Sequence, residues 1–406
     1  MKFGYNSEEI RMEEKNACLE RVWAQISCNL RKNVIQFVKS CERGVKNANM
    51  NKLIVVKVGS SSLTEKRGDL APEKLAELVR QIACLRAEGH RVVLVSSGAI
   101  AAGFRRLGFS QKPKKIAEKQ ASAAVGQGLL MEEYNRCFLA HGIATGQLLL
   151  TREDFSDARR FHNAYAALEV LLERGAVPIV NENDTVAIDE IGIGDNDTLS
   201  AQVAAMVHAD LLVLLTDIDG LYTADPSSDP DARHIDRVEK IDDTLHACAG
   251  GAGSGVGTGG MQTKLSGASL ATKAGVEVLI CSSAAEDALL HAVAGDIRGT
   301  CFSVQHFMSV RRQWLAFHAT PKGKLWVDAG AAKALIEQKK SLLPPGVRRA
   351  EGDFAAGDVV EVCEVGSDTP IGRGIVGYAR EELLALAQTP GSHGEAIHRD
   401  NWVTLL

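Results

Sequence analysis

The chain contains short apolar runs separated by longer stretches with helical spacing. The runs cover residues 53–58, 92–97, 177–180, 211–216 and 276–280. Such runs suit strands that are buried on both faces of a parallel sheet. Helical patterns lie between them at 72–87, 116–140, 161–172, 196–208 and 261–273. This alternation predicts an α/β fold with a doubly wound, mainly parallel sheet sandwich.

The pattern changes after about residue 310. The segments GKLWVDAG, GDVVEVCEVG and IGRGIVGY are short strands punctuated by glycine, with the spacing of a small β-barrel. We therefore predict one domain over 51–310 and a β-barrel-like domain over 322–406. Residues 1–50 carry nine Lys/Arg, six Asp/Glu and one stretch with helical spacing. This extension is either a docking helix or the result of a start codon upstream of Met50, and we assign it no chemistry.

Charge and cysteine usage limit the classes of function. The net charge of -5 does not indicate a nucleic-acid or membrane partner. Nine scattered cysteines without a CxxC pair fit neither a disulfide framework nor a zinc site. Apolar runs are far shorter than a membrane helix, and residues 1–50 lack the apolar core of a secretory signal. We expect a cytosolic protein that acts on small molecules.

Ligands of open α/β sheets bind beyond the carboxyl ends of the strands, so the loops there are informative. Lys57 lies near the end of the first run, before a turn of small residues whose amides can face a phosphate. A lysine at this place can also be a solvated strand edge. The second run leads into Ser96–Gly103, where a helix N-terminus can accept a carboxylate or simply form a tight turn.

Two polar clusters, Asn181–Asp184 and Gly194–Asp197, flank the loop after the third run. Asn and Asp are common turn formers and N-caps, and some of these residues have that role. The clusters together hold more Asn, Asp and Glu than capping requires. They can bind an ammonium group or orient basic groups near phosphate.

A fourth loop, Gly250–Gly260, has seven glycines in eleven residues and leads through Met261 into Lys264. Glycines let the backbone approach oxyanions, and a lysine on the first helical turn can reach a transferring phosphate. A flexible linker is the alternative. The chain has no GxxxxGK[ST] motif, and the GxGxxG match here follows no strand, which excludes a dinucleotide fold.

None of the histidines is placed as an obvious general base. A carboxylate substrate needs none, because it is already ionised at neutral pH. Phosphoryl transfer to it requires alignment and neutralisation of charge, which two lysines and magnesium can supply.

Several segments, in order, resemble the amino acid kinase family. They are VVKVGSSSLT, VSSGAIAAG, AAVGQG, GQLLLT, VPIVNENDTVA, GDNDTLSA, LLTDIDGLYTADP and GTGGMQTK. The similarity is greatest to members that phosphorylate the side-chain carboxylate of glutamate in the first step of proline biosynthesis. With the C-terminal part, it covers essentially residues 51–406.

The resemblance implies roles for individual residues. Lys57 and Lys264 would neutralise the phosphates, and Asp197 would hold both lysines in place. Ser97, Asp184 and Asn196 would bind glutamate, although Asn196 can also serve as a helix cap. ATP, with Mg²⁺, would be bound by Lys57, Thr216, Asp217, Thr258, Gly259, Gly260, Met261, Gln262, Thr263 and Lys264.

The C-terminal part resembles a PUA domain, a fold common in RNA-modifying proteins, through VDAGAAKALIEQKKSLLPPGV, GDF, GDVVEV and IHRDN. The chain is shorter than this family between Ala387 and Ile397. From Lys322 onward it has ten Lys/Arg and twelve Asp/Glu, which is not the basic footprint of phosphate-backbone binding. A structural or regulatory role is therefore favoured over RNA binding.

The resemblance as a whole implies an enzyme that makes L-glutamyl 5-phosphate from L-glutamate and ATP. It also implies a homo-oligomer, feedback inhibition by proline, and hand-over of the labile product to glutamate-5-semialdehyde dehydrogenase. Two alternatives remain. One is a related amino acid kinase with another carboxylate substrate, and the other is an RNA-binding PUA protein whose kinase domain is inactive.

Overall fold

The computed structural model describes residues 51–65, 69–186, 195–224, 226, 229–242, 245, 260–296, 299–304, 312, 314–389 and 394–405. Within these ranges the chain forms two separate main sheets, one built from residues before 303 and the other from residues after 322. The N-terminal extension, 1–50, lies outside the described residues.

The first sheet has eight strands among the described residues, in the order β3-β4-β2-β1-β5-β9-β10-β8. Neighbouring strands run parallel except β10, which is antiparallel to β9. The strands are β1 (Leu53–Val58), β2 (Arg91–Ser96), β3 (Thr145–Leu150), β4 (Val177–Glu182), β5 (Leu211–Thr216), β8 (Arg237–Val238), β9 (Glu277–Ser282) and β10 (Gly299–Phe302). A small hairpin of β6 (Leu221–Tyr222) and β7 (His234–Ile235) lies apart from it.

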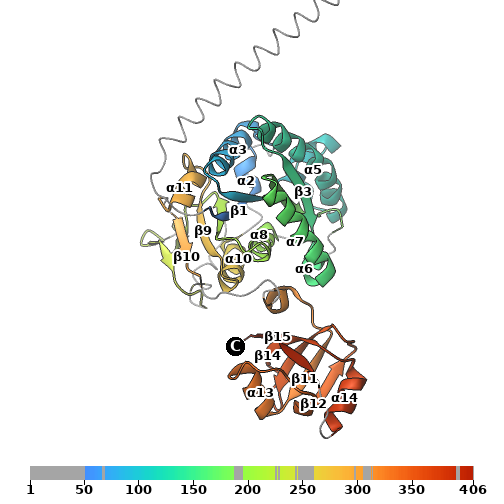
Figure 1. Cartoon of the computed structure of the whole chain (residues 1–406). Helices are drawn as coiled ribbons and strands as arrows, with labels where there is room; N and C mark the ends of the chain where they lie inside the picture. The colour runs from blue at the N-terminus through green and yellow to red at the C-terminus, as the bar shows by residue number, and fades with distance from the viewer. Residues whose placement is uncertain are drawn as a thin grey trace, which may run out of the picture. The chain divides into compact units, whose positions relative to one another are not determined.

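Helices cover both faces of this sheet (Figure 1). One apolar core packs alternate residues of β1, such as Val55, under α7 (Ala158–Glu173), α8 (Asp195–Met206) and α10 (Met261–Lys273). The other packs Ile54 and Val56 under α3 (Pro72–Ala87), α5 (Ile116–Leu139) and α11 (Ala288–Ala294). Shorter helical segments are α2 (Ser60–Leu63), α4 (Ala99–Gly103), η1 (Phe104–Leu107) and α6 (Arg152–Ser156). β1 is buried along its whole length because both cores need its side chains.

The predicted doubly wound sheet is confirmed, and all five predicted runs form strands within one or two residues of the expected bounds. The sequence did not predict β3, β8 and β10 of this sheet as strands. β3 lies at the sheet edge, is only partly buried and includes a glycine and a glutamine, so its apolar signal is diluted. β10 has four residues, one of them glycine.

The second sheet has five strands in the order β12-β11-β13-β14-β15 among the described residues. The strands are β11 (Gly323–Val327), β12 (Val347–Gly352), β13 (Val359–Glu364), β14 (Pro370–Val376) and β15 (Ile397–Thr404). α13 (Ala329–Ile336), η3 (Pro344–Gly346) and α14 (Arg380–Gln388) accompany them, and residues such as Leu325, Val360 and Leu383 share one core. This separate sheet confirms the small β-rich fold predicted for the C-terminal part.

A short helical segment, η2 (Trp314–His318), precedes the second sheet. Leu315 is fully buried in a small cluster with Val359 and Val403 of that sheet. The Arg373 guanidinium donates hydrogen bonds to the carbonyl oxygens of Ala316 and Ala319 at 3.3 and 3.4 Å. This segment is therefore packed against the second sheet.

No helix in the described part of the chain is long and apolar enough to cross a membrane. The cysteines that the structure describes, Cys84, Cys137, Cys281, Cys301 and Cys363, are all free thiols, and all but Cys301 are buried.

Candidate active site

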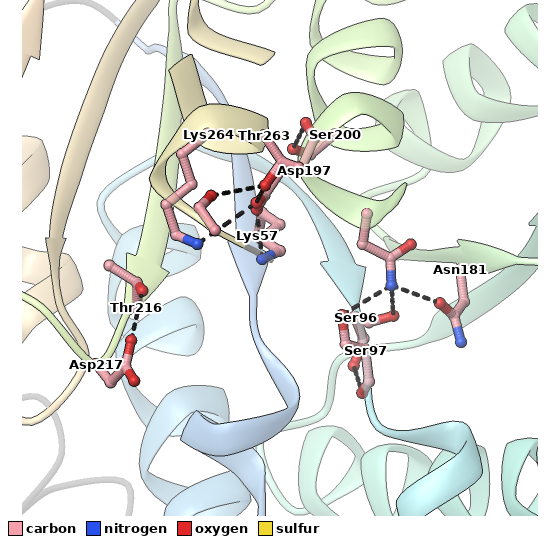
Figure 2. Close-up of polar contacts among 12 residues, drawn as sticks. Lys57, Ser96, Ser97, Asn181, Asp197, Ser200, Thr216, Asp217, Thr263 and Lys264 are labelled. Atoms are coloured by element: carbon pink, nitrogen blue, oxygen red, sulfur yellow. Dashed lines mark hydrogen bonds and ion pairs between the residues drawn. The ribbon is translucent and has the colours of Figure 1, made fainter. Parts of the chain in front are cut away.

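Two lysines and one aspartate meet at the carboxyl end of the central strand (Figure 2). Lys57, the next-to-last residue of β1, places Nζ 2.5 Å from Oδ1 of Asp197. Lys264, on the first turn of α10, places Nζ 3.5 Å from Oδ2 of the same carboxylate. The side chains of Lys57, Lys264 and Asp197 are only 9%, 7% and 0% exposed. The expectation that Lys57 is merely a solvated edge residue is thereby excluded.

Charge and burial act in opposite directions on this cluster. Burial alone would raise the pKa of Asp197, but the charges of Lys57 and Lys264 outweigh it, so the pKa lies below its usual range. Burial lowers the pKa of Lys264, and the charge of Lys57 lowers it further, while Asp197 raises it in part. One carboxylate thus stabilises two ammonium groups that would otherwise repel each other in a poorly hydrated place.

Close helix packing brings Lys264 to Asp197. A Cβ atom added to Gly267 of α10 would lie 2.9 Å from the carbonyl oxygen of Asp197, so only glycine fits without displacement. Thr263 also joins the two helices, because its hydroxyl donates to Oδ2 of Asp197 at 3.0 Å. Asp197 is in the first turn of α8, where the helix dipole favours a negative charge.

The neighbouring residue, Asn196, points to a second cluster on the side of β2 and β4. Its Nδ2 lies 2.8 Å from Oγ of Ser97, 3.0 Å from Oδ1 of Asn181 and 3.3 Å from the carbonyl oxygen of Ser96. Successive helical residues diverge by about 100°, so Asn196 and Asp197 serve different clusters from one turn of α8. Asn196 is therefore more than a helix cap.

Ser97 occupies the turn between β2 and α4. The next residue, Gly98, has φ +106°, a left-handed conformation that glycine adopts without strain. Asp184 lies in the turn two residues beyond β4 and is half-buried. The structure thus brings Ser97 and Asn196 together, and places Asp184 in the loop that follows the neighbouring strand.

Two residues predicted to bind ATP, Thr216 and Asp217, lie on the side of the lysine pair away from Ser97 (Figure 2). Thr216 ends β5, and its hydroxyl donates to Oδ1 of Asp217 at 3.0 Å. Gly260 precedes α10, whose first residues are Met261, Gln262, Thr263 and Lys264. Thr258 and Gly259, with the rest of the glycine-rich segment, lie outside the described residues.

We call the second cluster, made of Ser97, Gln127, Asn181 and Asn196, the amide cluster. Two of its residues, Gln127 and Asn181, were not predicted as site residues. Asn181 was noted only as part of a polar cluster, and Gln127 only as part of AAVGQG, one of the segments that resemble the family. Nδ2 of Asn181 donates to Oε1 of Gln127 at 2.9 Å, and both side chains are buried. A polar residue on the buried face of α5 was the available signal for Gln127.

Comparisons with known proteins identify the family of this chain. The model of the amino acid kinase family matches residues 52–282, and the model of the PUA domain matches residues 323–399. Because the first match covers more than half of the chain, the chain belongs to the amino acid kinase family.

Within that family the relatives can be named more closely. Glutamate 5-kinase of Streptococcus suis (strain 05ZYH33) is 54% identical over 355 residues, which are 87% of this chain and 99% of the relative. Glutamate 5-kinase of Streptococcus sanguinis (strain SK36) is also 54% identical, over 87% of this chain and 96% of its own. Among solved structures, carbamate kinase from Giardia lamblia bound to AMP-PNP aligns over 63% of this chain and 99% of its own, at 18% identity and a TM-score of 0.46.

Proposed function

We propose that this chain is a glutamate 5-kinase, which transfers the γ-phosphoryl group of ATP to the side-chain carboxylate of L-glutamate. The observation that carries the proposal is the buried pairing of Lys57 and Lys264 with one carboxylate, Asp197, at the carboxyl end of the central strand. Relatives that share about half of its residues over nearly their whole length, and that bear this name, support the substrate.

In the proposed reaction a carboxylate oxygen of glutamate attacks the γ-phosphorus in line. The bond from the γ-phosphorus to the bridging oxygen breaks, and ADP leaves with that bond's electron pair. Charge spreads over the phosphoryl oxygens and the leaving oxygen, and Lys57 and Lys264 stabilise it there. No proton needs to leave the nucleophile, because it is already ionised. This explains why the site is built from cations and one organising carboxylate.

Magnesium enters this scheme as a part of the substrate Mg²⁺·ATP. In the described part of the chain, no group of three or more His, Cys, Asp or Glu side chains is arranged to hold a metal. The buried Asp197 already pairs with two lysines. Mg²⁺ characteristically keeps several waters and is held by substrate phosphates with one or two carboxylates, so a site without a protein cage fits the ion.

The amide cluster is the proposed glutamate site. Ser97 and Asn196 present polar atoms beside the lysine cluster, and we assign them, with Asp184, to binding glutamate. Thr216, Asp217 and residues 258–264 are assigned to ATP. We further propose that 51–310 act as the kinase domain, that 322–406 act as a PUA domain with a structural or regulatory role, and that the enzyme is a cytosolic oligomer inhibited by proline.

The decisive test is glutamate-dependent release of ADP from Mg²⁺·ATP with hydroxylamine present to trap the acyl phosphate. We expect a hydroxamate from glutamate and none from aspartate or N-acetylglutamate, with less product when proline is added. Activity only with another acid would keep the phosphoryl-transfer site but refute the substrate. Absence of turnover with all of them, together with RNA binding, would favour an inactive kinase domain on an RNA-binding protein.

A further inference from the structure

A chain of hydrogen bonds between buried side-chain amides leads from α5 to the proposed glutamate site. Oε1 of Gln127 accepts a hydrogen bond from Nδ2 of Asn181 at 2.9 Å. Oδ1 of Asn181 accepts one from Nδ2 of Asn196 at 3.0 Å. Two buried atoms at the ends of this chain, Nε2 of Gln127 and Oδ1 of Asn196, have no hydrogen-bond partner within the described part of the protein.

The middle amide can adopt only one orientation. Oδ1 of Asn181 also accepts a hydrogen bond from the backbone amide of Glu182 at 2.9 Å. If the Asn181 amide were turned over, its NH₂ group would face the donors of Glu182 and Asn196, and its oxygen would face the oxygen of Gln127. Each of these contacts would be repulsive, so the backbone amide of Glu182 and the acceptor on Gln127 together hold the Asn181 amide in one orientation.

The orientation of the Asn181 amide determines which atom of the Asn196 side chain can face a ligand. Because Asn181 presents an acceptor, Asn196 must present its Nδ2, and this nitrogen also lies 2.8 Å from Oγ of Ser97. Among the described residues, Oδ1 of Asn196 is therefore left as a buried acceptor without a donor, which costs free energy until a ligand supplies one.

We propose that Gln127 is a positioning residue that acts through Asn181 to hold Oδ1 of Asn196 ready for the ammonium group of the amino acid substrate. The inference rests on the proposed function. The ammonium group is the chemical match, because it brings N–H donors and a positive charge to an unpaired carbonyl oxygen. Asp184, in the loop after β4, adds the negative charge that we assign to the same group.

The packing of α5 explains how a helix can reach the strand ends. A Cβ atom added to Gly126 would overlap the carbonyl oxygen of Ala99 in α4 and lie 2.5 Å from the amide nitrogen of Gly103. The two helices therefore touch backbone to backbone immediately before Gln127. One face of α5 then supplies polar groups to two strands, since Tyr134 forms a buried hydrogen bond of 2.8 Å with Oγ of Ser96.

The test removes the acceptor atom Oε1 of Gln127 and keeps the volume of the side chain. Gln127→Met leaves an unbranched side chain of similar size without Oε1. We expect the KM for glutamate to rise about tenfold, the value of one net hydrogen bond at the upper end of its usual range. The KM for Mg²⁺·ATP should stay near that of the wild type, whereas the midpoint of thermal unfolding should fall, because Nδ2 of Asn181 is left buried without an acceptor. Gln127→Glu, which keeps an acceptor oxygen, should restore the KM for glutamate to within about threefold.

A double-mutant cycle separates positioning from packing. If Gln127 acts through Asn196, Gln127→Met should have no further effect on the KM for glutamate in an Asn196→Ala background. Should Gln127→Met fail to fold, Asn181→Leu interrupts the same chain at its second member and must raise that KM at least as much.

Several results would overturn the inference. They are an unchanged KM for glutamate in Gln127→Met, an equal rise in the KM for Mg²⁺·ATP, or the same tenfold effect in the Asn196→Ala background. In each of these cases wild-type activity with glutamate stays intact, so the proposed function survives. A wild type that forms no hydroxamate from glutamate would instead refute the proposed function, and the inference would fail with it.

Discussion

Replacing Asp197 by asparagine tests the organisation of the lysine pair. The amide keeps the shape and one oxygen acceptor for Thr263, but it removes the charge that holds Lys57 and Lys264 together. The two ammonium groups then repel each other where water screens them poorly. We expect the protein to respond by releasing a proton from one lysine or by moving the two apart. Either response removes positive charge from the place where phosphate charge develops.

The size of the effect follows from the distances. A unit charge pair at about 4 Å interacts by about 4 kcal/mol at an effective dielectric constant of about 20. Lys264 lies 3.5 Å from the carboxylate and Lys57 lies 2.5 Å from it, so both interactions are of at least this order. Loss of one group that stabilises transition-state charge lowers kcat by about 10²- to 10³-fold. We expect that loss in kcat, with a much smaller change in the KM for glutamate.

The pH dependence should change as well. An ammonium group is charged below its pKa and loses the charge as pH rises through it. Burial already lowers the pKa of Lys264, and Asp197 is what raises it in part. Without that carboxylate the pKa must lie lower still, so activity of Asp197→Asn should decline with rising pH earlier than activity of the wild type. Initial rates of hydroxamate formation between pH 6 and 10 measure this shift.

A matched control is Asp210→Asn, at the opposite end of β5. Oδ2 of Asp210 accepts a hydrogen bond from the backbone amide of Leu53 at 2.7 Å and has no part in the proposed site. It should keep wild-type kcat and pH dependence. The argument would be wrong if Asp197→Asn folded normally and kept a kcat within threefold of the wild type, or if its alkaline decline stayed where the wild type has it.

Two further predictions concern packing and thiol reactivity. Gly126→Ala should lower the midpoint of thermal unfolding by several degrees, because its Cβ atom overlaps Ala99. Gly128→Ala, on the same helix with open space around it, should raise the midpoint slightly; equal effects of the two changes would contradict the close helix contact. Burial raises the pKa of Cys281 to about 12 and that of Cys301 to about 11, so both should resist alkylation at pH 8. Peptide mapping should find them labelled only after denaturation in urea, and rapid labelling of the native protein would contradict the raised pKa values.

The sheet could be predicted because its strands are buried on both faces. LIVVKV and LLVLLT form β1 and β5 with unchanged bounds, since central parallel strands carry a dense apolar signal. β3 escaped prediction because an edge strand needs fewer apolar residues. Helix α10 also has the bounds that the sequence predicted, Met261–Lys273.

The candidate site could be predicted only in part, because sequence patterns identify residue types better than partners. Lys57, Asp197 and Lys264 were chosen for their charge and for the resemblance, and the structure brings them together. Gln127 was not chosen although it lies in the family-like segment AAVGQG, since its hydrogen bond depends on which strand end α5 reaches. That position follows from a backbone contact at a glycine, which has no periodic signature.

The order of strands in the first sheet also has a consequence for synthesis. β1 is the first strand of the described chain, yet it lies in the middle of the sheet. It is hydrogen-bonded to β2 on one side and to β5, more than 150 residues later, on the other. A growing chain can pair β1 with β2 early, but one edge of β1 must wait for β5. Closing so long a loop is slow and leaves an apolar strand edge open meanwhile. We therefore expect nascent chains stopped before β5 to bind chaperones, and chains that already include β9 and β10 to bind them less.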